Sequence, residues 1–478
     1  MTDANHNIRS IEPATDVLIL GAGLAGLTTA HNLSEAQFNV IAIEKAPNIG
    51  GLARTIQHGD FRFDLGGHRF LTNDLAVDSY VKNLLKGDYL TVPRSSKILL
   101  NNKYFDYPLR PLNSVFGLGI FKSLQILIDY CVQKLKNKFS TQQHRSLEDW
   151  VTTQFGKTMY KLYFRDYSEK VWGISCNQIA KEWIAQRIQG LSLGDAIKAA
   201  VLNRKNKKHT TLIDNFIYPH LGIGAIADRL GEQVTGENKI LTSTSLVRLN
   251  HANGKILNAV VDLGERNKII EAKEFVSSIP LTALVHALSP RPPQEVLDAA
   301  NSLKFRDLVT VTLMINKERV TDQTWIYFPD KDIPFGRIHE PTNWSARMAP
   351  PGYSSLVAEY FCFKDDEIWG KTDEQLRDLT IEGLQSLNIL TRDEVMDSKV
   401  LRIPNAYPLF EVGFQEQCEI ILNYLDGFKN LSITGRSGMF RYFNMDHTIG
   451  SGMSIAQSII SKYPARKGTD VDVQENIA

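Results

Sequence analysis

Apolar and polar positions near the start of the chain alternate between strand-like runs and a helical pattern. Residues 16–20 (DVLIL) form one apolar run, and residues 40–43 form a second run that ends at Glu44. Between them, the segment LTTAHNLSEAQ repeats its apolar positions at helical spacing after a glycine-rich turn. Two parallel strands joined by a short helix require a right-handed crossover, so this pattern predicts the start of a doubly wound α/β sheet.

Helical periodicity dominates from about residue 112 to residue 203 and predicts a helical insertion. Within it, SLEDW at residues 146–150 offers a serine N-cap, an acidic first turn and a tryptophan on the buried side. Residues 115–132 form the most apolar long segment, but Lys122 and Asp129 interrupt it, and a membrane span needs ~20 mostly apolar residues. We expect a buried helix there rather than a membrane-facing amphipathic helix, because nothing nearby supplies a matching basic face.

Short alternating runs then predict strands. Residues 239–278 read as a β-meander with a turn at Asn253-Gly254, and strand-like segments recur at residues 309–315, 324–328 and 355–361. The chain closes with LSITGR, a loop and the helical run SGMSIAQSIISKY. Because the alternation is discontinuous, we expect a nucleotide-binding unit assembled from the first, middle and last thirds of the chain.

The length of 478 residues suggests about three structural units. We expect a discontinuous nucleotide-binding domain, a helical inserted domain, a mainly β substrate-side domain and a flexible polar tail. The nucleotide-binding domain is expected at residues 14–85, 212–285 and 425–465, and the helical domain at residues 112–205. The β domain is expected at residues 86–111 and 300–424, and the tail at residues 466–478.

Composition narrows the class of protein. The chain has 54 Lys and Arg against 53 Asp and Glu, with 43% hydrophobic and 22% charged residues, which is typical of a globular protein and argues against nucleic-acid binding. The four cysteines lie far apart, so neither a disulfide framework nor a metal site is expected. The N-terminal segment resembles no targeting signal, and we expect a cytoplasmic location.

The turn after the first strand carries the first chemical signal. Gly21, Gly23 and Gly26 form a G-x-G-x-x-G pattern, and Glu44 follows at the end of the next strand. The first glycine permits a tight turn, the second lets a pyrophosphate approach the helix N-terminus, and the third lets helix and sheet pack closely. The acidic side chain accepts hydrogen bonds from a ribose, so the pattern predicts dinucleotide binding.

Further glycines point to a flavin. The pairs Gly50-Gly51 and Gly66-Gly67 leave backbone amides bare for a flat ring or a phosphate, although two ordinary turns would look the same. Near the C-terminus a strand leads through Gly450 and Gly452 into a helix. A helix N-terminus there would place partial positive charge where a reduced flavin carries its anion.

These motifs resemble a known framework. Four segments are similar to the FAD-binding framework of flavin amine oxidases, protoporphyrinogen oxidases and UDP-galactopyranose mutases. They are GAGLAG with Glu44, IGGLART, LGGHRF and the closing GR…DH…GSG segment. Seven further segments resemble, in the same order, segments of the mutases, especially the eukaryotic type: YPL, SLEDWVTTQFG, FRDYSEKVWG, AQRI, WIYFPDKDIPFGR, NAYPLF and GRSGMFRY. The resemblance implies FAD as the cofactor and a Rossmann-like FAD-binding domain of the glutathione-reductase type, with an inserted helical domain and an antiparallel β-sheet substrate domain. No cysteine lies in the flavin segments near the C-terminus, so we expect the FAD to be noncovalent.

The resemblance also implies site residues. The cofactor-binding set is Gly21, Gly23, Gly26, Glu44, Gly51, Arg54, Gly67, His68, Gly435, Asp446 and Thr448. The substrate-binding set is Tyr107, Arg110, Ser168, Trp172, Arg187, Tyr327, Arg337, Tyr407, Arg436 and Tyr442. Within these sets, the catalytic roles fall to His68, Arg337 and Arg436. A buried diphosphate needs bidentate cationic partners, although each arginine taken singly is equally well explained by an ion pair.

Two positions depart from the mutases. Arg110 stands where the family has Gln, and Ser168 stands where it has Asn. An extra guanidinium could serve a different base, an additional phosphate or a carboxylated sugar, so the identity of the substrate is left open.

The implied activity is that of an FAD-dependent nucleotide-sugar mutase. In that family, reduced flavin N5 forms an adduct with the sugar while the nucleoside diphosphate leaves, so the ring opens and recloses without net redox change. The alternative is an FAD-dependent oxidase or dehydrogenase of the amine oxidase or protoporphyrinogen oxidase type. The segment Gly222-Ile-Gly224 does not fit a second nucleotide fingerprint, so NAD(P)H would serve only as a transient reductant.

Overall fold

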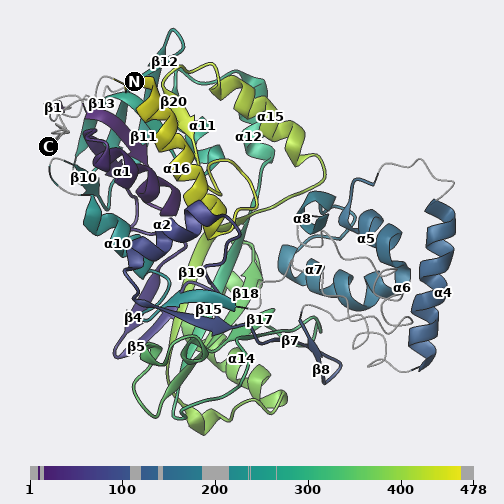
Figure 1. Cartoon of the computed structure of the whole chain (residues 1–478). Helices are drawn as coiled ribbons and strands as arrows, with labels where there is room; N and C mark the ends of the chain where they lie inside the picture. Colours follow the sequence, from purple (N-terminus) through teal and green to yellow (C-terminus); the bar gives the residue numbers. More distant parts are fainter. Residues whose placement is uncertain are drawn as a thin grey trace, which may run out of the picture.

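The molecule consists of two β-sheet domains with a helical domain at their side (Figure 1). The computed structural model describes residues 9–10, 15–107, 120–137, 144–185, 215–234, 236, 238–264 and 266–464. Three segments named above lie outside these ranges: the positions of Arg110 and Arg187, and the tail at residues 466–478. The domain limits given above stay predictions.

The first sheet has nine strands and is built on the predicted parallel unit. Its order is β10-β3-β2-β13-β12-β11-β14, and β1 and β20 pair with β13. The parallel strands are β10 (Lys239–Leu241), β3 (Val40–Ile43), β2 (Thr15–Leu20), β13 (Asn267–Ser277), β20 (Leu431–Ile433) and the short β1 (Arg9–Ser10). Helix α1 (Leu24–Glu35) connects β2 to β3, as the sequence predicts. Strands from the first, middle and last thirds of the chain therefore share one sheet.

A meander extends this sheet. Strands β11 (Ser245–Ala252) and β12 (Lys255–Asp262) pair antiparallel around the predicted Asn253-Gly254 turn, and β12 pairs with the first half of β13. The second half of β13 pairs with β2, so one long strand joins the meander to the parallel part. The short β14 (Leu288–Ser289) closes the edge against β11.

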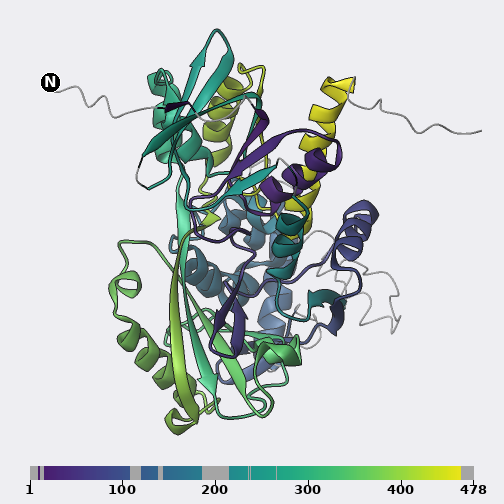
Figure 2. The ribbon, with the colours of Figure 1, turned by 90° about the vertical axis from the view of Figure 1, so that its left-hand side faces the viewer.

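The second sheet has seven strands in the order β19-β15-β18-β17-β16-β7-β8. They are β19 (Val395–Pro408), β15 (Phe305–Ile315), β18 (Ser354–Cys362), β17 (Arg337–His339), β16 (Trp325–Tyr327), β7 (Ser96–Leu100) and β8 (Lys103–Asp106). All neighbours are antiparallel except β16 and β7. Figure 2 shows the long strands β15 and β19 side by side, running up toward the first sheet.

The helical domain lies between residues 120 and 185. It contains α4 (Ile120–Asn137), α5 (Leu147–Phe155), α6 (Lys157–Met159), a π-helical turn (Tyr160–Arg165), α7 (Asp166–Trp172) and α8 (Lys181–Ala185). Ser146 caps α5 as predicted, because its hydroxyl accepts from the Asp149 amide in a capping box.

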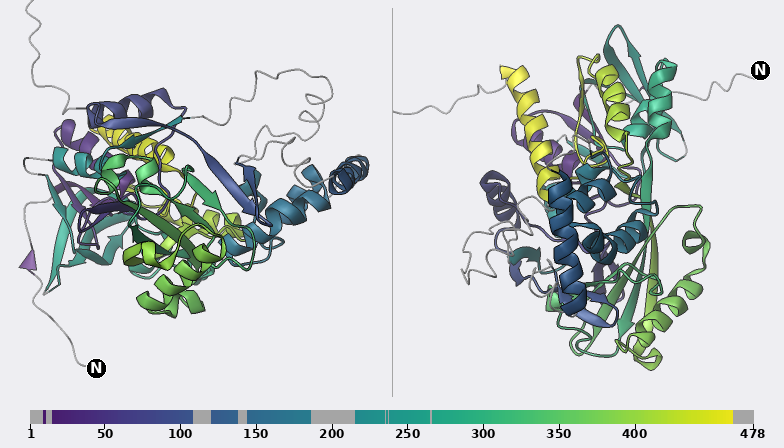
Figure 3. Two further views of the ribbon diagram at one scale, coloured as in Figure 1. Left: turned by 90° about the horizontal axis from the view of Figure 1, so that it is seen from below. Right: turned by 90° about the vertical axis from the view of Figure 1, so that its right-hand side faces the viewer.

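Helix α4 is not the buried helix that its apolar composition predicts. It is the outermost element of the helical domain, as both views of Figure 3 show. Its apolar side chains at Phe121, Leu124 and Ile128 are exposed, Phe121 to 91%, whereas Ile126 is fully buried. Asp129 instead faces inward and accepts hydrogen bonds from the amide and the hydroxyl of Thr158. The prediction fails because, within the described ranges, α4 packs on α5 and α6 along one side alone.

The C-terminal helix also begins earlier than predicted. Helix α16 spans Met445–Lys462, so Gly450 and Gly452 lie inside it rather than at its N-terminus. Gly452 is required by packing, since a Cβ there would lie 2.6 Å from the Ala25 carbonyl oxygen of α1. The N-terminus of α16 therefore lies at Asn444, before both glycines.

The remaining elements connect and cover the two sheets. The helices are α2 (Leu75–Leu85), α10 (Ala225–Gln233), α11 (Leu281–Ala287), α12 (Gln294–Ser302), α13 (Glu367–Gly370), α14 (Asp373–Ser386) and α15 (Phe414–Leu425). Short 3-10 turns lie at Pro341–Asn343, Ala346–Met348 and Arg392–Glu394. Two strand pairs stand apart, β4 (Thr55–His58) with β5 (Phe61–Asp64), and β6 (Tyr89–Pro93) with β9 (Asn215–Pro219). Among the described helices, none has the length and apolarity that crossing a membrane requires.

Candidate functional site

The glycine-rich turn after β2 has the shape that a dinucleotide needs. Gly21 has φ of +99°, and a Cβ on Gly26 would lie 2.0 Å from the Gly21 carbonyl oxygen, so α1 and β2 approach closely at this point. A Cβ on Gly23 would meet only the Gly51 Cα, at 4.0 Å. The backbone at Gly23 is therefore open at the N-terminus of α1, where a pyrophosphate is favoured.

Glu44 and Arg54 lie beside this turn. The Glu44 carboxylate accepts the Ala22 amide at 3.0 Å and the Ala46 amide at 2.9 Å, which fixes its orientation. Its oxygens keep further acceptor capacity for ribose hydroxyls. The Arg54 Nε donates to the Gly51 carbonyl at 2.8 Å. Burial lowers the pKa of Arg54, and the nearby Glu44 charge opposes that shift.

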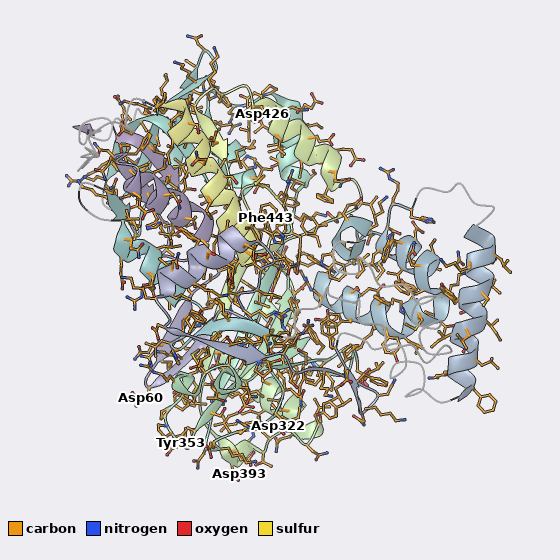
Figure 4. All side chains as sticks on the ribbon, viewed as in Figure 1. Asp60, Asp322, Tyr353, Asp393, Asp426 and Phe443 are labelled. Carbon is orange, nitrogen blue, oxygen red and sulfur yellow. The ribbon has the colours of Figure 1, made fainter. Side chains whose placement is uncertain are left out.

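The loop from β20 to α16 closes the same region. The Gly435 amide donates to the Ser451 hydroxyl at 3.3 Å, and a Cβ on Gly435 would lie 2.9 Å from the Ala25 Cβ of α1. Asp446 is in the first turn of α16 and lies 3.1 Å from His447 Nδ1. Figure 4 labels Phe443 at this end of α16.

Thr448 has a different local partner. Its hydroxyl donates to the Asn444 carbonyl at 2.9 Å, one turn back in α16. A cofactor contact through Thr448 stays a prediction, as does one through Asp446.

Arg337 and Glu359 form a buried ion pair across neighbouring strands. Arg337 on β17 lies opposite Glu359 on β18, donates from Nε at 2.9 Å to one carboxylate oxygen and donates from Nη2 to the other. Glu359 also accepts the Gly67 amide at 3.0 Å. Burial alone would raise the pKa of Glu359, but Arg337 and His339 hold it at about 2. The predicted cation at Arg337 is thus already paired, while its Nη1 has no hydrogen-bond partner among the described residues.

His68 lies next to this pair and is neutral at ordinary pH. Burial lowers its pKa to about 4; the Glu359 charge opposes this shift, and Arg436 and Arg337 add to it. Its Nδ1 is buried and has no hydrogen-bond partner among the described residues. A neutral imidazole with one unused nitrogen can donate to or accept from a bound ligand, but it does not supply a positive charge.

Arg436 is stacked between two tyrosines. Its guanidinium carbon lies 4.6 Å from the centre of the Tyr407 ring and 5.3 Å from that of Tyr442. Its Nε and Nη2 atoms are buried, and neither has a hydrogen-bond partner within the described ranges. No carboxylate there forms an ion pair with it either. A buried cation without a counter-ion is costly, so this arrangement is suited to an anionic ligand.

Aromatic side chains pack beside the arginines. Trp172 at the end of α7 is 2% exposed, packs edge-on against Tyr407 at 6.4 Å, and has a buried Nε1 without a partner in the described part of the chain. Ser168 lies one turn earlier in α7 and is buried too. Tyr107 and Tyr327 pack with their ring centres 4.7 Å apart. The structure thus brings together most of the predicted substrate residues.

Sequence reasoning missed several residues of this cluster. Glu359 is the partner of Arg337. The sequence does contain a signal for it, because a single carboxylate lies inside the apolar run SSLVAEYFC, and charged side chains are almost never fully buried unless paired. Arg69 and Arg94 also lie in the cluster, against Trp325. Arg69 lies in the LGGHRF segment quoted above, whereas nothing in the sequence distinguishes Arg94 from a surface arginine.

The arrangement fits a flavin dinucleotide and an anionic ligand. The open Gly23 backbone and the oriented Glu44 carboxylate suit the dinucleotide, and the unpartnered atoms of His68, Arg436 and Trp172 suit a ligand beside it. Across the described ranges, no group of three or more His, Cys, Asp or Glu side chains could hold a metal ion.

Comparisons with known proteins agree on the fold. Residues 24–460 match the family model described as flavin containing amine oxidoreductase. A probable UDP-galactopyranose mutase of Klebsiella pneumoniae is 24% identical over 93% of this chain and 95% of its own length. The chloroplastic protoporphyrinogen oxidase of Nicotiana tabacum is 22% identical over 83% of this chain and 77% of its own length. A crystal structure of reduced UDP-galactopyranose mutase matches with a TM-score of 0.81, 20% identity and 95% coverage of both chains.

Proposed function

Because the chain belongs to the flavin-containing amine oxidoreductase family, we propose that it is an FAD-dependent mutase of nucleoside-diphosphate sugars. The family implies FAD as the cofactor. The similarity to UDP-galactopyranose mutases over nearly the whole chain supports the finer assignment. The reaction would interconvert pyranose and furanose forms without net redox change.

The observation that carries this proposal is the uncompensated charge of Arg436. Its guanidinium is stacked on Tyr407 and Tyr442, and two of its nitrogens are buried without partners in the described part of the chain. A diphosphate would supply acceptors for these nitrogens, and hydrogen bonds to charged groups contribute about 1.5 to 3 kcal/mol each. An amine substrate, which carries a positive charge, would be repelled by the same group.

The residues then take separate roles. Arg436 and the Nη1 edge of Arg337 would hold the diphosphate and stabilise its charge as it leaves the sugar. Tyr407 would orient the diphosphate, and Trp172 would bound the sugar site. His68 would hold a ligand hydroxyl or a flavin edge through Nδ1 as a neutral partner, since its pKa is lowered to about 4. Bound FAD would supply the reactive atom that exchanges with the diphosphate at the anomeric carbon.

An anaerobic assay tests the proposal. Protein reduced with dithionite is mixed with a panel of nucleoside-diphosphate sugars, and products are separated by chromatography and weighed by mass spectrometry. We expect at least one nucleotide sugar to give an isomer of equal mass. On later aeration, the oxygen consumed should equal the amount that reoxidises the reduced flavin. Failure of every sugar to react or to perturb the flavin absorbance would contradict the mutase assignment.

An oxidase or dehydrogenase is the second candidate. Residues 24–460 match the amine oxidoreductase model, and the aromatic wall of Tyr107, Tyr167 and Tyr327 would also suit an apolar substrate. Turnover with stoichiometric oxygen uptake and peroxide formation would favour this candidate. An oxygen electrode measures the uptake, and the oxygen released when catalase is added reports the peroxide.

Two finer points belong to the same proposal. NAD(P)H would reach the flavin only transiently, and anaerobic bleaching of the flavin absorbance by NADH or NADPH tests this. A cytoplasmic location is proposed from the dispersed cysteines, all four of which are free.

A further inference from the structure

Two arginines outside the predicted set share one aromatic platform. Arg69 follows the loop after β5, and its guanidinium carbon lies 4.3 Å from the centre of the Trp325 ring. Arg94, just before β7, places its guanidinium carbon 5.8 Å from the same ring and 5.1 Å from the Tyr107 ring. Two positive charges therefore lie on the same small group of ring faces.

Neither charge has a carboxylate partner among the described residues. Two other arginines with little exposure pair with carboxylates, Arg337 with Glu359 and Arg306 with Asp366. Arg69 and Arg94 form no ion pair within the described ranges, and the Nε of Arg94 is buried there without a hydrogen-bond partner. Burial lowers the pKa of Arg69 to about 10, and the charges of Arg94 and Arg337 add to this shift.

The pair is continuous with the proposed diphosphate site. Arg69 is the chain neighbour of His68, which lies beside Arg337. Tyr327 connects the two regions, because it lies opposite Arg337 in the β16–β17 register and its ring packs on Tyr107 at 4.7 Å. A ligand held by Arg436 and Arg337 would thus extend past Tyr327 toward Arg69 and Arg94.

The charge balance of the whole arginine cluster favours a ligand that carries one negative charge beyond those of its diphosphate. With Arg337 neutralised by Glu359, the described cluster contains three guanidinium groups without counter-ions: those of Arg436, Arg69 and Arg94. The diphosphate of a nucleotide sugar brings two negative charges. One further negative charge, such as that of a carboxylate, would balance the third guanidinium.

We propose that Arg69 and Arg94 form a carboxylate-binding subsite, so that the substrate is a nucleoside-diphosphate sugar acid rather than a neutral sugar. The inference rests on the proposed function and specifies its substrate class. Two planar guanidinium groups held on aromatic faces present several N–H donors at little cost in side-chain entropy, which suits a flat carboxylate.

Matched sugar pairs test the subsite on the FAD-loaded protein. UDP-glucose is compared with UDP-glucuronate, UDP-galactose with UDP-galacturonate, and GDP-mannose with GDP-mannuronate, by titrating the flavin absorbance anaerobically. We expect the acid of at least one pair to bind about tenfold or more tightly than its neutral partner, as one to two charge-assisted hydrogen bonds imply. In Arg94→Gln and Arg69→Gln the ratio of the two dissociation constants should fall toward one.

The controls separate the possible failures. Arg94→Lys keeps the charge and should keep part of the preference, and FAD content measured by absorbance reports whether each variant folds. The exposed Arg319, which pairs with Asp322, gives the matched control Arg319→Gln, which should leave the ratio unchanged. Equal binding of acid and neutral sugars by the unaltered protein, or a preference that survives in Arg69→Gln and Arg94→Gln, would overturn the subsite and leave the mutase proposal standing. If no nucleotide sugar binds at all, the proposed function falls, and the subsite falls with it.

Discussion

Among single residues, Arg436 is the one whose environment is hardest to explain without a ligand. Its neighbours Tyr407 and Tyr442 supply ring faces, but its buried Nε and Nη2 find no acceptor in the described part of the chain. Arg337 differs, because Glu359 satisfies two of its nitrogens. A ligand would therefore meet a net positive charge at Arg436, whereas the Arg337–Glu359 pair is neutral overall.

Replacing Arg436 by Met tests this difference. Arg436→Met keeps much of the side-chain volume and removes a buried charge that has no counter-ion, so we expect the ligand-free protein to unfold at the same or a higher temperature. Binding of a nucleoside diphosphate should weaken by about 10- to 100-fold, since one or two charge-assisted hydrogen bonds are lost. Calorimetry measures both quantities, and Arg319→Met is the surface control. A large loss of thermal stability in Arg436→Met would show that the charge serves the fold.

The Arg337–Glu359 pair predicts acid sensitivity. The folded pKa of Glu359 is about 2 against an ordinary 4.5, so its stabilising effect is complete above pH 4.5 and is lost as the pH falls from 4.5 toward 2. This difference corresponds to about 3 kcal/mol. Glu359→Gln leaves Arg337 buried without its counter-ion and should cost about 3 to 5 kcal/mol at neutral pH. Urea titrations at several pH values measure this, with the exposed Glu318→Gln as control.

His68 acts in a second, higher pH window. Its folded pKa of about 4 lies below the ordinary 6.5, so the folded state favours the neutral ring, and stability is lost as the pH falls from 6.5 toward 4. His68→Gln should remove this contribution, so that the variant gains stability relative to the unaltered protein as the pH falls from 6.5 toward 4, and it should leave the Glu359 window in place. An unchanged profile between pH 6.5 and 4 would contradict the assigned burial of the imidazole.

At the scale of elements, the helices show how position in the fold overrides composition. Helix α4 presents Phe121, Leu124 and Ile128 to the outside although its sequence is apolar, and it buries Ile126 and turns Asp129 inward. Helix α16 contains Gly452 because its backbone packs closely against α1. In both cases the neighbouring element, rather than the local sequence, determines the surroundings of the side chain.

Two substitutions in α4 distinguish its faces. Ile128→Gln on the exposed face should change the free energy of unfolding by less than about 0.5 kcal/mol, because the side chain buries little area. Ile126→Ala on the buried face should cost about 2 to 5 kcal/mol through lost packing. Chemical denaturation measures both, and equal effects would mean that both faces are covered in solution.

At the scale of the whole molecule, the nucleotide site depends on distant parts of the chain. The turn at Gly21, the carboxylate of Glu44 and the loop at Gly435 meet because β2, β3 and β20 belong to one sheet. The ligand cluster similarly joins the loop after β5, strands of the second sheet and the loop before α16. Binding at either place therefore requires the assembled fold.

Removal of FAD should lower the stability of the whole chain. The glycine turn at Gly21 and the loop at Gly435 come together only in the folded state. Added FAD at about 100 times its dissociation constant should therefore stabilise that state by about 2.7 kcal/mol. Differential scanning calorimetry of stripped and reloaded protein measures the shift, with riboflavin, which lacks the diphosphate, as the ligand control. An unchanged unfolding temperature would contradict a flavin dinucleotide site at this turn.

The sequence by itself determined the parts of this protein that depend on neighbouring residues. The glycine turn, the β2–α1–β3 unit with Glu44, and the Ser146 cap follow from backbone sterics and local hydrogen bonds, which act over a few residues. Only the tertiary structure decided that Glu359 neutralises Arg337, that Arg436 stacks on Tyr407, and that α4 faces outward. Those outcomes depend on burial and charge pairing between segments far apart in the chain, and a local pattern such as the lone carboxylate in SSLVAEYFC does not identify the partner.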